Sequence, residues 1–340
     1  MKVGQRMAMH APFGGKCMRF PIAAFAAIAM EESPMRDDRM LNVLQGMVLF
    51  RCVTTSIVAK TWFAQSSSAI SMYEMARQMI RAMVRQRVAI IHGRHNRESV
   101  VIATSEGRRM ASVETRQIGR ASVGSNGRLL FDAHTVSVAE VLGRLSQQIS
   151  LIPFMRFICA CETPIVAGDQ GGGKRSDAVV GIVSMPTDAV ASHGVFRPVA
   201  WTTWDDVQAV ITHNLRGNIE EIAGYYAIEV DRGAVSLSSF RERARIYRQG
   251  REEPPSASMP VAPIPLVITT TPQRAESIVR VWSESDPDTI IFAIDWESFF
   301  RYDVFTRAWF AYRGRSVRSP YDRLSPFGAL RTRKVKIAPA

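Results

Sequence analysis

Hydrophobic positions in the first part of the chain recur at helical spacing. Ser33 and Pro34 suit the N-cap and first position of a helix. Apolar side chains then recur every three or four residues, at Met40, Leu41, Leu44, Met47 and Val48. This pattern predicts one long helix over residues 34–63.

A second helix is predicted over residues 68–86, where apolar and cationic side chains occupy different faces. Arg77, Arg81 and Arg85 are spaced four residues apart on one face. The apolar face is rich in methionine, which is more typical of core packing than of a cofactor site; it comprises Met72, Met75, Met79, Ile80 and Met83. The segment is therefore interpreted as an amphipathic helix with a cationic side.

From Val88 the pattern changes to short apolar runs separated by turn residues. Residues 88–91 and 100–103 flank Gly93 and Asn96, which predicts a β-hairpin. Further short strands are expected near 110–117 and 128–131, so the first basic stretch of the chain is expected to be largely β.

Helices and strands alternate in the rest of the chain. Ser137 and Glu140 have the spacing of a capping box, which predicts a helix to about Ile149. Residues 225–237 are expected to form a hairpin and Ser239 to begin an Arg-rich helix. Residues 266–270, 272–282 and 289–296 then give a β-α-β pattern.

These elements predict an α+β fold and not a regular doubly wound sheet. Residues 254–265 contain five prolines and are interpreted as a linker. The expected organisation is a basic N-terminal arm, a main α+β body, the linker, a C-terminal β-α-β segment with an aromatic helix, and a basic tail. The ranges are 1–32, 33–253 (helical 33–86, basic and β-rich 87–132, mixed 133–253), 254–265, 266–318 and 319–340. Residues 1–29 also resemble a targeting presequence, and the intact arm is the favoured interpretation.

Composition indicates a globular protein with an ordinary core. The chain has 340 residues, of which 46% are hydrophobic and 22% charged, with four cysteines. These values exclude a disordered chain, a fibrous repeat and a disulfide scaffold. Neither the cysteines nor the six histidines have the spacing of a metal site, and no apolar stretch is long enough to span a membrane.

Positive charge is concentrated in two segments and consists mainly of arginine. Of 43 basic residues, 37 are Arg. Residues 77–128 carry 11 basic and 3 acidic side chains, residues 301–340 carry 10 and 2, and the region between them is acidic, with 14 and 21. Arginine suits phosphate and interface ion pairs, although GC-rich codon usage explains the same bias. The two basic segments are therefore the main candidate surfaces for a polyanion or an acidic partner.

The candidate nucleic-acid or partner contacts are the arginines and lysines of these segments. In the C-terminal segment they alternate with aromatic side chains, which suit either base stacking or a protein interface. The candidates are Arg77, Arg81, Arg85, Arg94, Arg97, Arg108, Arg109, Arg313, Arg315, Arg318, Arg331, Arg333, Lys334 and Lys336.

A second set of residues supports an alternative, enzymatic hypothesis. Residues 168–176 have the glycine spacing of a phosphate-binding loop from Gly168 through Gly173 to Lys174, but lack the Ser/Thr that would hold magnesium. The apolar run ending at Asp295 and Glu297 resembles a metal-binding strand. A glycine-rich surface loop and a strand running into a helix capped by Asp295 explain the same residues more simply.

We expect a non-enzymatic structural or assembly protein of a large nucleoprotein particle, in first place a viral capsid shell component. Its expected partners are neighbouring subunits, including copies of itself, and RNA, with no cofactor, and its expected location is the virion or the cytoplasm. The alternatives are a nucleotide- or nucleic-acid-processing enzyme and a mitochondrial ribosome-associated protein.

Overall fold

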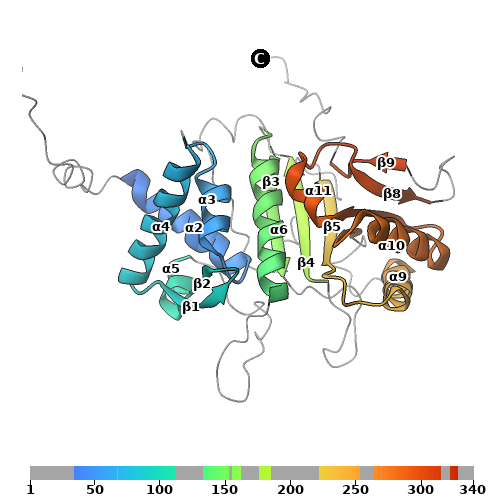
Figure 1. Cartoon of the computed structure of the whole chain (residues 1–340), viewed down its shortest axis with the longest axis horizontal. Helices are drawn as coiled ribbons and strands as arrows, with labels where there is room; N and C mark the ends of the chain where they lie inside the picture. The colour runs from blue at the N-terminus through green and yellow to red at the C-terminus, as the bar shows by residue number, and fades with distance from the viewer. Residues whose placement is uncertain are drawn as a thin grey trace, which may run out of the picture. The chain divides into compact units, whose positions relative to one another are not determined.

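We analysed a computed structural model of the chain, shown in Figure 1. The structure describes residues 34–66, 68–111, 133–152, 155–161, 176–184, 222–252, 263–314 and 322–327. Residues 1–38 and 39–340 form separate units.

The predicted 34–63 helix is two helices, α2 (Pro34–Leu49) and α3 (Thr55–Trp62). The chain leaves the helical conformation at Arg51, whose φ is 70°, and Val53 then forms a β-bridge with Val101. Thr54 caps the new helix, its hydroxyl oxygen accepting a hydrogen bond from the Ile57 N–H at 3.3 Å. The prediction of one helix failed because the apolar spacing continues across the break. Thr54 then caps a new helix.

The second predicted helix is confirmed as α4 (Ala69–Arg85), and the hairpin as β1 (Ala89–His95) and β2 (Glu98–Ala103). The strands are antiparallel with His95 opposite Glu98, so Asn96 and Arg97 form a two-residue turn. Both have positive φ, 48° and 68°, as a type I′ turn requires. A short helix, α5 (Ser105–Met110), follows, so the first basic segment is not largely β where it is described.

The remaining elements centre on one mixed sheet. In chain order they are α6 (Ala133–Ser150), β3 (Met155–Cys161), β4 (Ala178–Ser184), β5 (Ile222–Val230), α9 (Leu237–Glu252), β6 (Ile264–Thr269), α10 (Pro272–Ser285), β7 (Ile290–Asp295), α11 (Trp296–Arg301), β8 (Trp309–Arg313) and β9 (Asp322–Leu324). The described strands β3 to β9 lie in the sheet in sequence order. β5, β6 and β7 are parallel, and antiparallel strands extend the sheet on both sides.

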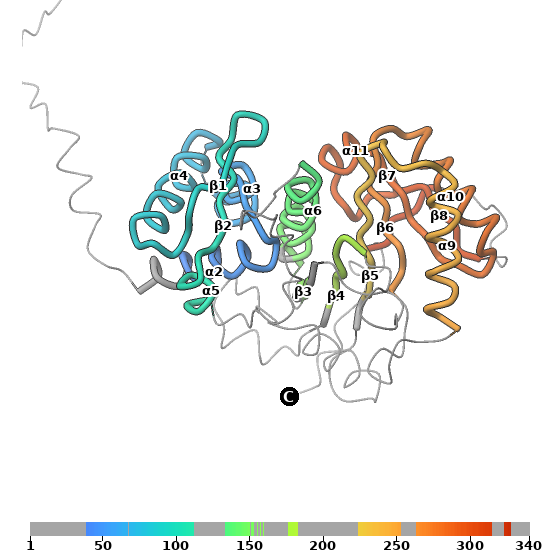
Figure 2. Tube along the Cα trace, turned by 90° about the horizontal axis from the view of Figure 1, so that it is seen from below, coloured from blue at the N-terminus to red at the C-terminus, as the bar shows by residue number. Residues whose placement is uncertain are grey.

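Helices cover both faces of the sheet, as Figure 2 shows. α9 and α10 pack on one face, where Phe240, Tyr247 and Trp282 are buried against alternate strand residues. α6 lies on the other face and also packs on α3, so the N-terminal helices share one hydrophobic core with the sheet. The α3–α6 approach is close: a Cβ added at Gly143 would lie 2.9 Å from the Thr61 Oγ1.

Two local predictions were wrong within the described residues. Ser137 lies inside α6, which begins four residues earlier, and its hydroxyl donates to the Ala133 carbonyl at 2.8 Å. The predicted hairpin over 225–237 is β5 followed by a loop into α9. The proline-rich segment 254–265 includes the first two residues of β6 and connects elements of a single sheet, since β5 and β6 pair directly.

The α+β fold class is confirmed: helices accompany both the hairpin and the mixed sheet. The β-α-β pattern near the C-terminus is also confirmed, as β6, α10 and β7. Among the described residues, no helix combines the length and apolar character needed to cross a membrane.

Candidate nucleic-acid interface

Helix α4 presents one face to the core and one to solvent. Ser68 caps the helix, its Oγ accepting from the Ser71 N–H at 3.1 Å. Ala76, Ile80 and Met83 are buried. Since residues three and four apart share a helix face, this packing leaves the opposite face free to carry polar side chains.

The exposed face of α4 is cationic. Arg77, Arg81 and Arg85 are all exposed, and Gln78 lies beside them. Glu74 is the acidic residue of this helix; it pairs with Arg77 at 3.5 Å and accepts from the Gln78 amide at the same distance. Arg81 and Arg85 make no ion pair with any described carboxylate, so their positive charge is available to a ligand.

Positive charge continues from the end of α4 into the hairpin. Arg87 is exposed in the link between them, and Arg94 and Arg97 are exposed at the far end of the hairpin. Within the described part of the chain none of the three forms an ion pair. Glu98, the nearest acid in sequence, accepts the Ser56 backbone N–H of α3 at 3.0 Å.

Helix α5 contributes less positive charge than its sequence indicates. Arg109 pairs with Glu106 at 2.6 Å. The hydrogen bond from Arg109 lowers the pKa of the Glu106 carboxyl and keeps it ionised. Arg108 is half-buried and donates to the Ser105 hydroxyl at 3.3 Å. These two candidates are therefore partly neutralised or screened on the protein itself.

Two consecutive isoleucines of β1 are exposed. Ile90 and Ile91 are 46% and 57% exposed. Sequence analysis placed them in the strand but did not predict their exposure, because an apolar pair gives no sign of which face is covered. Each adds apolar surface to a hairpin whose other exposed side chains are mostly polar.

The C-terminal basic candidates are described only in part. Arg313 is exposed at the end of β8. The other six lie outside the described residues: Arg315, Arg318, Arg331, Arg333, Lys334 and Lys336. The aromatic side chains expected to stack on bases are mostly core residues, because Phe299, Trp309 and Phe310 are buried. Phe299 and Trp309 pack edge to face at 5.9 Å between ring centroids, and Phe310 belongs to the core on the other face of the sheet.

The alternative nucleotide site is likewise only partly described. Gly168, Gly173 and Lys174 lie outside the described residues. Asp295 caps α11, its Oδ1 accepting from the Ser298 N–H at 3.0 Å, and Glu297 points to solvent beside Arg301, 3.7 Å away. Where the structure is described, no group of His, Cys, Asp or Glu side chains is placed to hold a metal ion.

Other arginines join α9 and α10 to the sheet and to each other. Arg243 pairs with Glu229, Arg251 with Asp286 and Arg274 with Asp231. All the carboxylates in these pairs are buried. Such pairs hold a fold together but are not available to bind a ligand.

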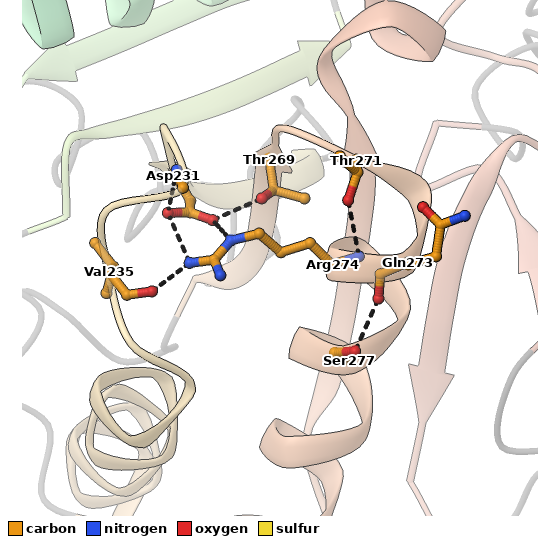
Figure 3. Close-up of polar contacts among 8 residues, drawn as sticks. Asp231, Val235, Thr269, Thr271, Gln273, Arg274 and Ser277 are labelled. Atoms are coloured by element: carbon orange, nitrogen blue, oxygen red, sulfur yellow. Dashed lines mark hydrogen bonds and ion pairs between the residues drawn. The ribbon is translucent and has the colours of Figure 1, made fainter.

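The Arg274–Asp231 pair is part of a network of hydrogen bonds, as Figure 3 shows. Asp231 accepts from the Arg274 guanidinium, from the Thr269 hydroxyl at 2.6 Å and from the Gly233 N–H at 3.0 Å. Burial alone would raise the pKa of this carboxyl, but these hydrogen bonds outweigh it and lower the pKa. Arg274 also donates to the Val235 carbonyl, so it ties the β5–α9 loop to the first turn of α10.

Comparisons with protein-family models, with curated proteins and with solved structures each returned no match to this chain.

Proposed function

We propose that this chain is a non-enzymatic protein that binds nucleic acid through the surface formed by α4 and the β1–β2 hairpin. The observation that carries the proposal is the set of exposed arginines on these elements that lack acidic partners among the described residues: Arg81, Arg85, Arg87, Arg94 and Arg97. Eight arginines face three glutamates between residues 69 and 111, and those glutamates already have partners on the protein.

Unpaired arginines on an exposed surface favour a ligand that carries many negative charges. Each guanidinium offers a planar fork of donors that matches phosphate oxygens. Neutralising phosphates releases the counterions condensed on a nucleic acid, which drives binding and makes it depend on salt. An acidic protein lacks this dense and regular charge, so the salt dependence separates the two kinds of partner.

The geometry gives the enzymatic alternative less support. A metal-dependent nuclease or nucleotide hydrolase needs carboxylates that converge with open coordination positions. The described carboxylates near the carboxyl ends of β5 and β7 already have partners: Asp231 is bonded to Arg274, and Asp295 caps α11.

We further propose that the nucleic acid belongs to a large nucleoprotein particle, in first place a virion, in which the chain contacts neighbouring subunits and RNA or DNA. Sedimentation velocity of the protein from its native source, recorded at nucleic-acid and protein wavelengths, tests this extension. Comigration with a particle that high salt weakens would support it. A small, salt-indifferent species free of nucleic acid would contradict it, and location in the cytoplasm or in mitochondria would then have to be tested directly.

The binding proposal itself is tested with purified full-length protein and labelled DNA and RNA oligonucleotides, with fluorescence anisotropy recorded at several salt concentrations. The double variant Arg81→Ala/Arg85→Ala is expected to reduce the slope of log K against log salt by about 2, one for each lost phosphate contact. The matched control is Arg241→Ala/Arg245→Ala, which removes two exposed arginines of α9. Equal losses in both variants, or no binding by the wild-type protein, would contradict the proposal.

A further inference from the structure

The geometry points to double-helical DNA as the ligand of this surface, with α4 in the major groove and the β1–β2 hairpin against the adjacent backbone. This inference rests on the proposed function, and it adds the class of nucleic acid and the part that each element plays.

Helices α3 and α4 pack together with the β1–β2 hairpin. α3 and α4 pack against each other, and α4 leads directly into the hairpin. The bridge between Val53 and Val101 fastens the segment before α3 to the inner strand of the hairpin. The helix pair and the hairpin are therefore held together, with α4 as the second helix, which is the position of the DNA-reading helix in helix-turn-helix modules.

The length and the side chains of α4 suit the major groove of DNA. Its 17 residues make a rod of roughly 25 Å. The major groove of B-form DNA is about 12 Å wide and admits such a helix. Arg77 and Gln78 occupy the middle of the exposed face, and arginine and glutamine are the side chains that pair bidentately with guanine and adenine edges.

The hairpin suits contact with the sugar–phosphate backbone. The turn at Asn96 and Arg97 places a cationic residue at its tip, and Arg94 is exposed nearby on β1. These positions lack a rigid helical face that could align several side chains with base edges. We assign them to phosphate contacts, which position a protein but do not read sequence.

Two features favour a DNA duplex over the other forms of nucleic acid. The major groove of A-form RNA is too deep and narrow for side chains to read. Proteins that bind single strands use exposed aromatic side chains as stacking platforms. Tyr73 is the one Phe, Tyr or Trp between residues 69 and 103, and its hydroxyl is 3.2 Å from the Ser56 hydroxyl. The surface therefore offers a helix for a wide groove but no aromatic platform.

The first test compares three ligands of one mixed sequence: a DNA duplex of roughly 20 base pairs, about two helical turns, the RNA duplex and the DNA single strand. Full-length protein is titrated into each at the same salt concentration. Tighter binding of the DNA duplex than of both others is expected. Equal or tighter binding of the RNA duplex or the single strand would overturn the inference while leaving the proposed function intact. Binding to none of them would overturn both.

The second test asks whether α4 reads bases. Selection from a library of randomised duplexes is expected to enrich a short motif, and loss of a bidentate base contact in Gln78→Ala or Arg77→Ala is expected to weaken binding to that motif about 5- to 150-fold. Arg97→Gly is expected to weaken binding to all duplexes alike, and glycine suits the positive φ at this turn, so the hairpin is preserved. Arg245→Ala on α9 is the control. Absence of any enriched motif, or equal losses on all sequences in every variant, would overturn groove reading by α4.

Discussion

The arginines of α9 and α10 and those of α4 and the hairpin share a side chain but differ in what surrounds them. Arg243 and Arg274 meet buried carboxylates at the sheet. Arg81, Arg85 and Arg97 are exposed and have no acidic partner in the described part of the chain. The first group satisfies charges that the fold has buried, whereas the second leaves its charge at the surface.

The difference shows that arginine content alone does not identify a binding surface. A buried carboxylate needs a cation, because an unpaired charge in the interior is costly. An exposed arginine without a partner contributes little to folding, so its position is free to serve a ligand. Mutation of the first group should therefore reduce stability, and mutation of the second should reduce binding.

The largest expected effect is that of Arg274→Ala. It leaves the Asp231 carboxylate buried without its cation and frees the β5–α9 loop from α10. We expect the free energy of unfolding to fall by about 3–5 kcal/mol, measured by chemical denaturation. The exposed Arg245 gives the matched control: its replacement by alanine should leave the unfolding midpoint nearly unchanged. A similar loss in both variants would contradict the distinction.

Asp231→Asn tests the same pair through its pH dependence. The lowered pKa means that the ionised carboxylate stabilises the fold above its ordinary pKa of about 3.9, and that this stabilisation is lost as the pH falls through the lower folded-state pKa. At pH 7 we expect the variant to be less stable by about 1.5–3 kcal/mol. The difference should shrink in denaturation curves recorded below about pH 4. A difference that does not change with pH would show that the charge of Asp231 is not involved.

A smaller effect is expected for Ser68→Ala, which removes the N-cap of α4. The Ser68 hydroxyl accepts from the Ser71 N–H, and loss of such a cap costs about 1 kcal/mol. Thermal unfolding measures this loss. Nucleic-acid affinity should decrease only slightly, since Arg81 and Arg85 lie three turns or more along the helix.

The smallest effect on stability is expected for Arg81→Ala/Arg85→Ala. Both side chains are exposed, and we expect the free energy of unfolding to stay within about 0.5 kcal/mol of the wild-type value. Circular dichroism during chemical denaturation gives the comparison. A large loss of stability would mean that these arginines belong to the fold, as Arg274 does.

Much of the secondary structure could be predicted because it depends on local patterns. The apolar stripe of α4, the alternation around Asn96 and the Thr271–Pro272 start of α10 each specify an element without help from distant residues. The break at Arg51, and the loop that follows β5 where a hairpin was expected, could not be predicted, because tertiary partners decide them. Val53 is held as a strand residue by Val101, and α9 follows β5 because parallel strands need a crossover.

The candidate site could be predicted only in part. The spacing of Arg77, Arg81 and Arg85 identified the cationic face, since helical periodicity fixes which side chains share a side. Sequence could not distinguish Arg109, which is paired with Glu106, from Arg97, which is not. Nor could it show that Phe299 and Trp309 are core residues, because aromatic residues occur both in interiors and at interfaces.

Arginine footprinting decides whether one group of arginines binds DNA while the other holds the fold together. The full-length protein is treated with phenylglyoxal, with and without a bound DNA duplex, and modified positions are identified by mass spectrometry. We predict that Arg81, Arg85, Arg94 and Arg97 react in the free protein and are protected by DNA, while Arg243 and Arg274 stay unreactive in both. Protection of Arg241 and Arg245 on α9 instead, or no protection of the α4 and hairpin arginines, would contradict the claim.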